Sequence, residues 1–219
     1  MTGAERDGLI QLTPEARQPG WWHLFRDVLP NPYEVYIGLE AGASSIRNFE
    51  PVVVPGLLQT EDYARAVTLL GHGNAPAEEV ERRVSLRMAR KPLLKGPQAP
   101  HLWAVIDEAV LRRPIGGPKV MRAQLEYLIE CAAMPSVTLQ VIPFQAGGHS
   151  AAGGPFSILR FAEADLPDIV YLEQLTSAIY LDKRETVDHY MAVMERLCLD
   201  AFPAEHSTDA ISTIAEQLS

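Results

Sequence analysis

The stretch Leu102–Asp107, L-W-A-V-I-D, decides how the second half of the chain is interpreted. Leu102, Ala104 and Ile106 alternate with the residues between them, and this period of two is typical of a β-strand. The strand runs straight into a pair of acids, and a pair of arginines follows shortly after. Such an abrupt junction between an apolar strand and charged residues often marks a site or an interface.

The segments that follow this strand predict an α/β arrangement. Pro118 suits the first turn of a helix, and the apolar stripe that begins there ends at Pro135. A closing helix carries Val187, Met194 and Leu197 on one face. Between these two helices lie three predicted strands, Val137–Ile142, Phe156–Phe161 and Ile169–Gln174. The order strand, helix, three strands, helix predicts a sheet whose later half is mostly antiparallel.

Helical patterns predominate upstream. The apolar spacing from Tyr33 to Phe49 is near 3.6, so we expect a helix there that Pro51 ends. Thr60 can cap a second helix, whose first turn carries two acids that suit the positive end of the helix dipole. A third helix is expected over Glu78–Arg90, and its basic run continuing to Lys91 is interpreted as a solvated face paired with nearby glutamates.

The domain organisation is predicted from the Pro- and Gly-rich stretch Lys91–Pro100, the best linker in the chain. We expect a remnant linker helix over 1–20, a mainly helical subdomain over 21–98, an α/β subdomain over 99–203 and a C-terminal tail over 204–219. The alternative is that the tail and residues 21–203 form one continuous domain. The predicted fold class is α/β (α+β): a helical N-terminal part packed on a mixed, mostly antiparallel sheet with flanking helices.

Composition excludes several classes of protein. With 219 residues, 47% hydrophobic and 21% charged, the chain can bury a proper core. A net charge of −9 with scattered basic residues argues against direct contact with nucleic acid. Cys131 and Cys198 fall at apolar helical positions, as expected for reduced, buried thiols. Since no signal peptide or run of about 18 apolar residues is present, we expect a cytoplasmic protein without membrane contact.

Asp107 and Glu108 are the first candidates for acid/base chemistry. Adjacent strand residues point to opposite faces, so both cannot act on one substrate atom. The simpler interpretation is that Asp107 caps the following turn while Glu108 pairs with Arg112 or Arg113. The sequence leaves open whether Asp107 and Glu108 take part in acid/base chemistry or only in capping and ion pairing.

The Gly-rich loop around His149 is the second candidate region, because loops often carry function. Neither a dinucleotide fingerprint nor a P-loop ending is present, and no G-x-S-x-G elbow surrounds its serines, so the loop suits covering a pocket better than holding a phosphate. His149 itself is most simply a hydrogen-bonding residue that orders the loop. Tyr171 and Glu173 share one face of a predicted strand and could line a pocket with His149. No metal site or cofactor is expected.

Many sequence blocks match one known family in order. They are Trp21-Trp22, Y-I-G-L-E (Tyr36–Glu40), S-I-R-N-F-E-P (Ser45–Pro51), V-P-G-L-L-Q-T-E-D-Y-A-R-A (Val54–Ala66), V-I-D-E-A-V-L-R-R-P-I-G-G (Val105–Gly117), V-M-R-A-Q-L (Val120–Leu125), P-F-S-I-L-R-F (Pro155–Phe161) and V-Y-L-E (Val170–Glu173). Over about residues 9–190 the chain resembles the C-terminal regulatory domain of actinobacterial Xre-type, antitoxin-like transcriptional regulators (WhiJ-type, Scr family). A helix-turn-helix normally precedes that domain, and we expect this chain to lack it.

The resemblance implies a regulatory domain that binds a small-molecule signal or a small BldB-like partner protein, with a homodimer as a further expectation. The expected ligand- or partner-binding residues are Trp21, Trp22, Gln59, Tyr63, Arg112, His149, Phe156 and Glu173. The alternative is a stand-alone enzyme of specialised metabolism on the same domain, with acid/base chemistry in a pocket under the Gly-rich loop. Its expected catalytic groups are Asp107, Glu108, His149, Tyr171 and Glu173.

Overall fold

A computed structural model describes residues 20–29, 31–163 and 165–218 of the chain. Its strands are β1 (Ser45–Glu50), β2 (His101–Asp107), β3 (Val137–Ile142), β4 (Phe156–Arg160), β5 (Ile169–Glu173) and β6 (Ala178–Leu181). Its α-helices are α3 (Asn31–Gly42), α4 (Glu61–His72), α5 (Ala77–Ala89), α6 (Glu108–Arg112), α7 (Pro118–Ala132), α8 (Arg184–Asp200) and α9 (Ala204–Glu216). Short 3₁₀ turns are η1 (Trp21–Phe25), η2 (Gly56–Leu58), η3 (Lys91–Leu94) and η4 (Phe144–Ala146). The remnant helix expected over 1–20 lies almost wholly outside the described residues.

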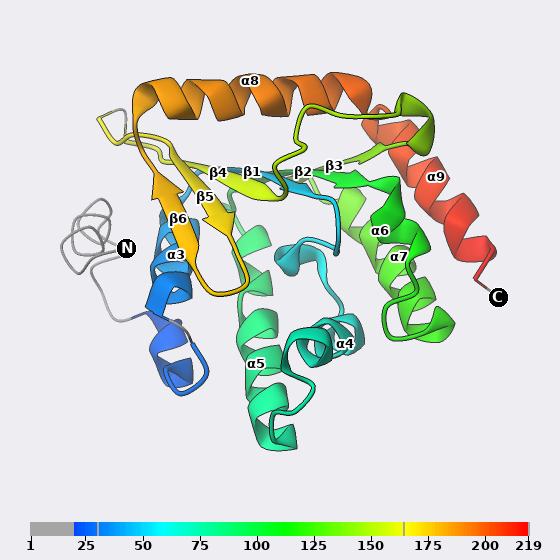
Figure 1. Ribbon diagram of the computed structural model, residues 1–219, viewed down its shortest axis with the longest axis horizontal. Helices are drawn as coiled ribbons and strands as arrows, with labels where there is room; N and C mark the ends of the chain where they lie inside the picture. Colours follow the sequence, from blue (N-terminus) through cyan, green and yellow to red (C-terminus); the bar gives the residue numbers. More distant parts are fainter. Residues whose placement is uncertain (1–19, 30, 164, 219) are drawn as a thin grey trace.

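One mixed sheet organises the described part of the chain, with strand order β3-β2-β1-β4-β5-β6 (Figure 1). β1 pairs in parallel with β2, and β2 pairs in parallel with β3. The pairs β1–β4, β4–β5 and β5–β6 are antiparallel. The sheet thus has a parallel half and an antiparallel half that meet at β1, which confirms the expected α/β fold with a mixed sheet.

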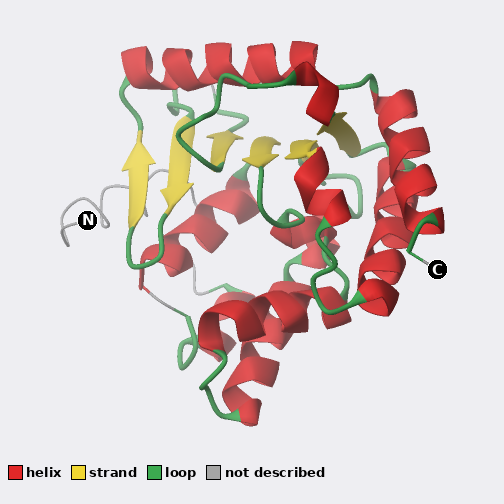
Figure 2. Ribbon diagram, turned by 45° about the vertical axis from the view of Figure 1, so that its right-hand side comes forward, coloured by secondary structure: helices red, strands yellow, loops and turns green. Residues whose placement is uncertain are grey.

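The two faces of the sheet are covered differently (Figures 1 and 2). The α8 face packs Phe49, Phe156 and Val170 against Met194 and Leu197 of α8. The opposite face, here called the inner face, lies against the remaining helices. The larger core there joins strand residues to helical residues such as Leu39, Tyr63, Leu86, Leu125 and Ile211. Because side chains alternate along each strand, every central strand contributes to both cores.

Several helix boundaries follow from local chemistry that the sequence shows. Thr60 caps α4, since its hydroxyl accepts a hydrogen bond from the backbone N–H of Tyr63 at 3.4 Å. Pro118 begins α7 as predicted, and Gly117 before it has a φ of 89°, which favours glycine. The strand predicted over Val137–Ile142 has those bounds in the structure.

The helix predicted from Tyr33 to Phe49 is wrong in its second half. α3 ends at Gly42, and Ser45–Glu50 form β1 between β2 and β4. Glycine is a poor helix former, and six residues are enough for a strand. The apolar spacing near 3.6 carried across this break by coincidence, because Ile46 and Phe49 belong to opposite faces of the sheet.

The position of β1 also bears on the expected division near residue 98. This strand belongs to the segment 21–98, yet it hydrogen-bonds to β2 and β4 of the segment 99–203. Within the expected tail 204–219, residues Ala204–Glu216 form α9, which packs on α7 and β3 and places Ile211 and Ile214 in the larger core. The segments therefore share one sheet and one core. Among the described residues, no helix is both long and apolar enough to cross a membrane.

Candidate functional site

A row of side chains crosses the inner face at the middle of the sheet. Asn48 of β1 is opposite Ser157 of β4, Ser157 is opposite Tyr171 of β5, and Tyr171 is opposite Tyr180 of β6. Directly opposite residues have Cβ atoms only about 5 Å apart. The register therefore places two polar side chains beside two phenols on one surface.

Glu50 and Glu173 extend this surface toward the ends of their strands. Each lies two residues beyond a member of the row, Asn48 in one case and Tyr171 in the other, so both face the same side. β1 and β5 run in the same direction, because each is antiparallel to β4. The two carboxyl groups thus lie at the same end of the row. The carboxylate–tyrosine cluster consists of Asn48, Glu50, Ser157, Tyr171, Glu173 and Tyr180.

Tyrosines of α3 continue this cluster. The ring of Tyr36 lies 4.3 Å, centroid to centroid, from that of Tyr171, which in turn lies 5.1 Å from that of Tyr180. Tyr33 stacks on Tyr36 at 5.7 Å with an interplanar angle of 13°. The four rings form a continuous aromatic wall beside the two glutamates. Burial raises the pKa of the Tyr33 and Tyr36 phenols, so both stay protonated at neutral pH.

A buried ion pair between Arg90 and Glu40 holds this aromatic wall in place. Arg90 donates from Nε at 2.9 Å and from Nη2 at 2.6 Å to the two carboxylate oxygens of Glu40, which is 1% exposed. Arg90 also donates to the Tyr33 hydroxyl, and its guanidinium lies 5.6 Å from the centroid of the Tyr36 ring. The prediction that the basic run is a solvated face is wrong for Arg90. Its contacts show a structural role in positioning the tyrosines.

Gln59 lies in the segment between β1 and α4. It is fully buried, donates from Nε2 to the Val54 carbonyl at 2.7 Å, and accepts from Arg87 at 3.2 Å. Lys91 donates to the Gln59 carbonyl at 2.9 Å. Tyr63 is also buried and accepts at its hydroxyl from the Val54 N–H at 3.2 Å. Gln59 and Tyr63 were both expected to bind a ligand, and in the structure their polar atoms hold the loop.

Glu50 has the most informative electrostatics of the cluster. It keeps partial exposure, yet burial raises its pKa from 4.5 to about 8. The negative charge of Glu173 raises this pKa further. A side-chain hydrogen bond with Asn48 and the positive charge of Arg87 lower it. Glu50 is therefore largely protonated at neutral pH. Perturbed carboxyl groups of this kind concentrate at functional sites.

Asn48 supplies a second unusual feature. The residue is 8% exposed, and its Nδ2 donates to Ser157 Oγ at 3.0 Å. Its Oδ1 is buried and has no hydrogen-bond partner among the described residues. A buried acceptor without a partner costs about 1–3 kcal/mol. Such groups are rare in folded proteins and call for an explanation.

Asp107, Glu108 and Arg112 do not join the cluster, because their polar atoms are used in the fold. Asp107 caps α6 by accepting from the Ala109 N–H at 2.7 Å. Glu108 accepts from Arg112 Nε at 2.6 Å and from the Phe144 N–H at 2.8 Å. The simpler interpretation of this acidic pair, capping and pairing, is thus the observed one.

His149 and Phe156 lie on the α8 face. The His149 ring contacts that of Phe49 at a centroid distance of 5.0 Å, and its Nδ1 accepts from the Ala151 N–H at 3.3 Å. Phe156 is buried against Phe49 and Tyr190. The sheet separates both residues from Tyr171 and Glu173. The pocket expected to join His149 with those two residues is therefore not assembled.

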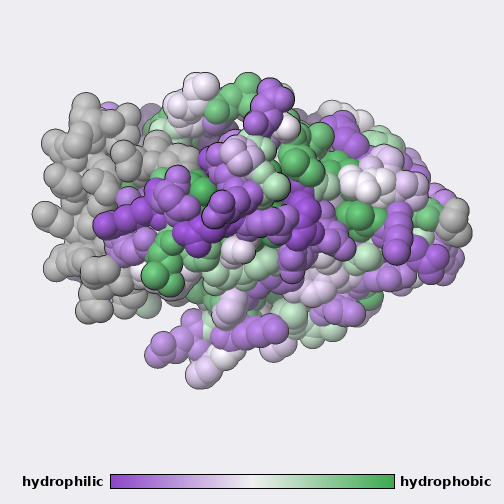
Figure 3. Space-filling view, turned by 90° about the horizontal axis from the view of Figure 1, so that it is seen from below, coloured by the Kyte–Doolittle hydropathy of each residue, from purple (hydrophilic) through white to green (hydrophobic). Residues whose placement is uncertain are grey.

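The aromatic pair at the start of the described chain divides in the same way. Trp22 is 5% exposed and belongs to the larger core, whereas Trp21 is 37% exposed and packs edge-on against Trp22 and Phe25. On the face of the molecule seen from below, hydrophobic residues form small separate areas among hydrophilic ones (Figure 3). Trp21 shares η1 with Leu24, which is 74% exposed.

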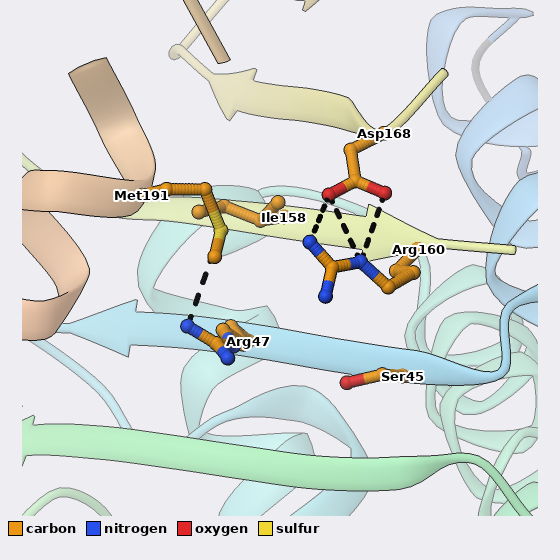
Figure 4. A pocket seen from close by; sticks show the side chains of 6 residues that line it. All are labelled: Ser45, Arg47, Ile158, Arg160, Asp168 and Met191. Carbon is orange, nitrogen blue, oxygen red and sulfur yellow. Dashed lines mark hydrogen bonds and ion pairs between the residues drawn. The ribbon is translucent and has the colours of Figure 1, made fainter. Parts of the chain in front are cut away.

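A small hollow on the α8 side offers a contrasting site (Figure 4). Its cavity volume is about 10 Å³, far below the roughly 300–1,000 Å³ of ordinary ligand pockets. Arg160 is held there by Asp168 at 2.7 Å, and Arg47 lies against Met191 Sδ at 4.0 Å and over the Trp103 ring. Because this space is too small for a ligand, we do not favour the hollow as the functional site.

Sequence reasoning did not single out Glu50, Asn48 or Tyr33 as site residues. Assigning residues 45–50 to a helix hid the shared face of Asn48 and Glu50. The available signal was Gly42 followed by a short segment that ends at Pro51, the pattern of a strand bounded by breakers. Tyr171 and Glu173 were singled out because their spacing puts them on one strand face.

A comparison with protein families gives one match, which covers residues 33–213 with the model of a domain of unknown function (DUF5753). The chain belongs to the DUF5753 family. That family is known from actinobacterial Xre-associated proteins. No curated protein and no solved structure matches this DUF5753 chain significantly. Every described member of the carboxylate–tyrosine cluster lies within the matched range of the DUF5753 domain. No group of three His, Cys, Asp or Glu residues in its described part is placed to hold a metal ion.

Proposed function

We propose that this DUF5753 chain is the regulatory domain of a cytoplasmic Xre-type, antitoxin-like transcriptional regulator of the WhiJ-type, Scr family, and that it binds a small-molecule signal at the carboxylate–tyrosine cluster. The sequence blocks described above support the regulator assignment. The acidic net charge of −9 supports a domain that leaves DNA contact to another module.

One observation carries the choice of site: Asn48 Oδ1 is buried and has no partner in the described part of the chain, and it lies beside Glu50, which shares its surface with a second carboxyl group. Both features cost free energy in the ligand-free protein. A ligand that satisfies them recovers part of that cost on binding. The small-molecule version is therefore favoured over a BldB-like partner, for which Trp21 and Leu24, the exposed apolar side chains of η1, offer little contact area.

Thermal unfolding with a panel of small molecules tests the proposal. The panel contains amines, alcohols and carboxylic acids of matched size, each added to wild type, to Glu50→Gln and to Glu126→Gln. Glu126 is exposed on α7 and pairs with Arg122, so its variant is a matched control away from the cluster. We expect at least one class to raise the Tm of wild type and the control, and to raise that of Glu50→Gln less. If every class leaves the Tm unchanged, the cluster is not a small-molecule site.

The enzyme alternative keeps one supporting observation. A pKa of about 8 lets Glu50 act as a general acid or base near neutral pH, and Glu173 lies on the same surface. This version replaces the acid/base groups expected from the sequence, of which only Tyr171 and Glu173 belong to the cluster. Mass spectrometry of a bound probe after prolonged incubation separates the two functions: a sensor returns the probe unchanged, whereas an enzyme converts it.

A further inference from the structure

The hydrogen-bonding groups of the carboxylate–tyrosine cluster are unevenly balanced. Asn48 Oδ1 lacks a donor among the described residues, the Glu173 carboxyl group adds acceptor atoms, and Glu50 adds more once it loses its proton. Several nearby donors are already engaged: Asn48 Nδ2 on Ser157, one N–H of Arg87 on Gln59, and Arg90 on Glu40. A ligand that brings N–H donors of its own therefore suits this surface.

The charges around Glu50 also favour a ligand that carries a positive charge. The negative charge of Glu173 on β5 disfavours ionisation of Glu50 on β1, and Tyr63 of α4 stays neutral because burial raises its pKa. Arg87 of α5 is the positive group that acts on Glu50, but it donates to Gln59 and forms no ion pair among the described residues. Arg90 is neutralised by Glu40. A cation placed between the two carboxyl groups would pair with Glu173 and favour the ionised form of Glu50.

The aromatic wall suits a cation as well. The rings of Tyr36, Tyr171 and Tyr180 follow one another at centroid distances of 4.3 and 5.1 Å beside the two glutamates. The electron-rich faces of tyrosine attract ammonium groups, and several such rings together with carboxylates are a common way to hold an amine. The cation on the other side of this wall, Arg90, already uses the Tyr33 and Tyr36 rings in this manner.

We infer that the ligand of the carboxylate–tyrosine cluster is a small organic cation with a protonated primary amine, held between Glu50 and Glu173 with its N–H groups directed to these carboxylates and to Asn48 Oδ1. This inference rests on the proposed function and adds the chemical class of the signal. It follows from the acceptor-rich surface, the two carboxyl groups at the same end of the row and the tyrosine wall together.

Binding of the ammonium ligand then displaces the proton of the Glu50 carboxyl group. At neutral pH Glu50 carries a proton, and an ammonium ion beside it stabilises the ionised form. The amine arrives already protonated, and the Glu50 proton passes to the buffer, so charge and atoms balance as COOH plus RNH₃⁺ giving COO⁻·RNH₃⁺ plus H⁺. Linkage requires the affinity to rise as the pH rises toward 8. The expected slope is at most about tenfold in Kd per pH unit.

Isothermal titration calorimetry of the full chain with matched probes tests this. The probes are benzylamine, benzyl alcohol and benzoate, with butylamine, butanol and butyrate as a second, non-aromatic series. We expect both amines to bind more tightly than the alcohol and the acid of the same skeleton. Titrations at pH 7 in phosphate and in HEPES, which contains no primary amine and whose ionisation enthalpy differs from that of phosphate, should show release of close to one proton for each amine bound.

Two variants make the result specific. Glu50→Gln should abolish the proton release and weaken amine binding about tenfold or more, because it removes a charge-assisted hydrogen bond. Glu126→Gln should change neither quantity. Equal or tighter binding of the alcohols or acids, or amine binding without proton release, overturns the amine assignment. If those probes bind in a Glu50-dependent way, the proposed small-molecule site stands and only the ligand class is wrong; if no probe binds, both fail.

Discussion

The two faces of the sheet treat buried polar groups in opposite ways. On the α8 face, the Trp103 indole N–H donates to Gln140 Oε1 at 2.8 Å, and Gln140 Nε2 donates to the Phe202 carbonyl at 2.9 Å. On the inner face, Asn48 Oδ1 has no partner among the described residues, and Glu50 lies near a second carboxyl group. Both faces bury polar groups that the chain itself satisfies, such as Gln140 on one face and the Arg90–Glu40 pair on the other. Among the described residues, the inner face also holds a buried amide oxygen, Asn48 Oδ1, that has no hydrogen-bond partner.

This difference separates structural polarity from functional polarity. A polar group within a core is stabilising when its partners come from the chain itself, as for Gln140. Polar groups that the fold positions but does not satisfy lower stability, and proteins retain such defects mainly at sites of function. Polar residues in a sequence look alike in both cases. The partners distinguish them, and the following variants test that distinction.

The largest effect is expected where the inner face is held together by a buried charge pair. Glu40→Gln removes the partner of Arg90 and leaves a buried guanidinium unpaired, so we expect a loss of about 3–5 kcal/mol in the free energy of unfolding. Urea denaturation measures it. The control, Asp168→Asn, breaks the partly exposed pair with Arg160 and should cost only about 0–1 kcal/mol. Similar costs for both variants would contradict this account of the inner face.

The next effect depends on pH. The pKa of Glu50 is about 8 in the folded protein and 4.5 ordinarily, so the folded state binds the extra proton. Its stabilising contribution is complete below pH 4.5 and is lost as the pH rises through 8. Glu50→Gln should therefore match wild type at pH 4.5 and exceed it by on the order of 2–4 kcal/mol at pH 9. Parallel stability curves from urea titrations across this range would exclude the raised pKa.

A direct comparison of the faces comes from two amide-to-leucine changes. Gln140→Leu on the α8 face leaves the Trp103 N–H without its acceptor and removes one of the two donors to the Phe202 carbonyl, at an expected cost of about 1–3 kcal/mol. Asn48→Leu on the inner face also loses one bond to Ser157, but it removes an acceptor that had none, so its cost should be below about 1 kcal/mol. Chemical denaturation of both variants in one buffer gives the difference. The reverse order would mean that Asn48 is satisfied in solution.

The smallest effect is expected at His149. Its Nδ1 makes a single hydrogen bond to its own loop, so His149→Ala should change the free energy of unfolding by no more than about 0.5–1 kcal/mol. Because the sheet separates His149 from Glu173, binding of any ligand at the carboxylate–tyrosine cluster should stay within twofold of wild type by calorimetry. A large loss of binding would show that the two faces are coupled and would revive the pocket expected from the sequence.

Local patterns were sufficient for much of the fold. The caps at Thr60 and Asp107, the helix that starts at Pro118 and the strand Val137–Ile142 all depend on residues close in sequence, and each was predicted. β1 was not. Its hydrogen-bond partners are residues 101–106 on one side and 156–160 on the other, and no short-range signal records such distant pairing.

The site shows the same division. Tyr171 and Glu173 could be placed on one face from their spacing alone, because strand alternation is a local property. That Glu50 joins them, and that His149 does not, followed only once the strand order β1-β4-β5 was known.

The sequence by itself determined the class of fold, the charge, several helix and strand boundaries and, through its blocks, the family resemblance, because these depend on composition and on neighbours along the chain. Only the tertiary structure decided which polar side chains share a surface and which of them lack partners. The reason is physical: the pKa of Glu50 and the unmet hydrogen bond of Asn48 depend on burial and on groups from other strands and helices, and these are brought near only when the sheet forms.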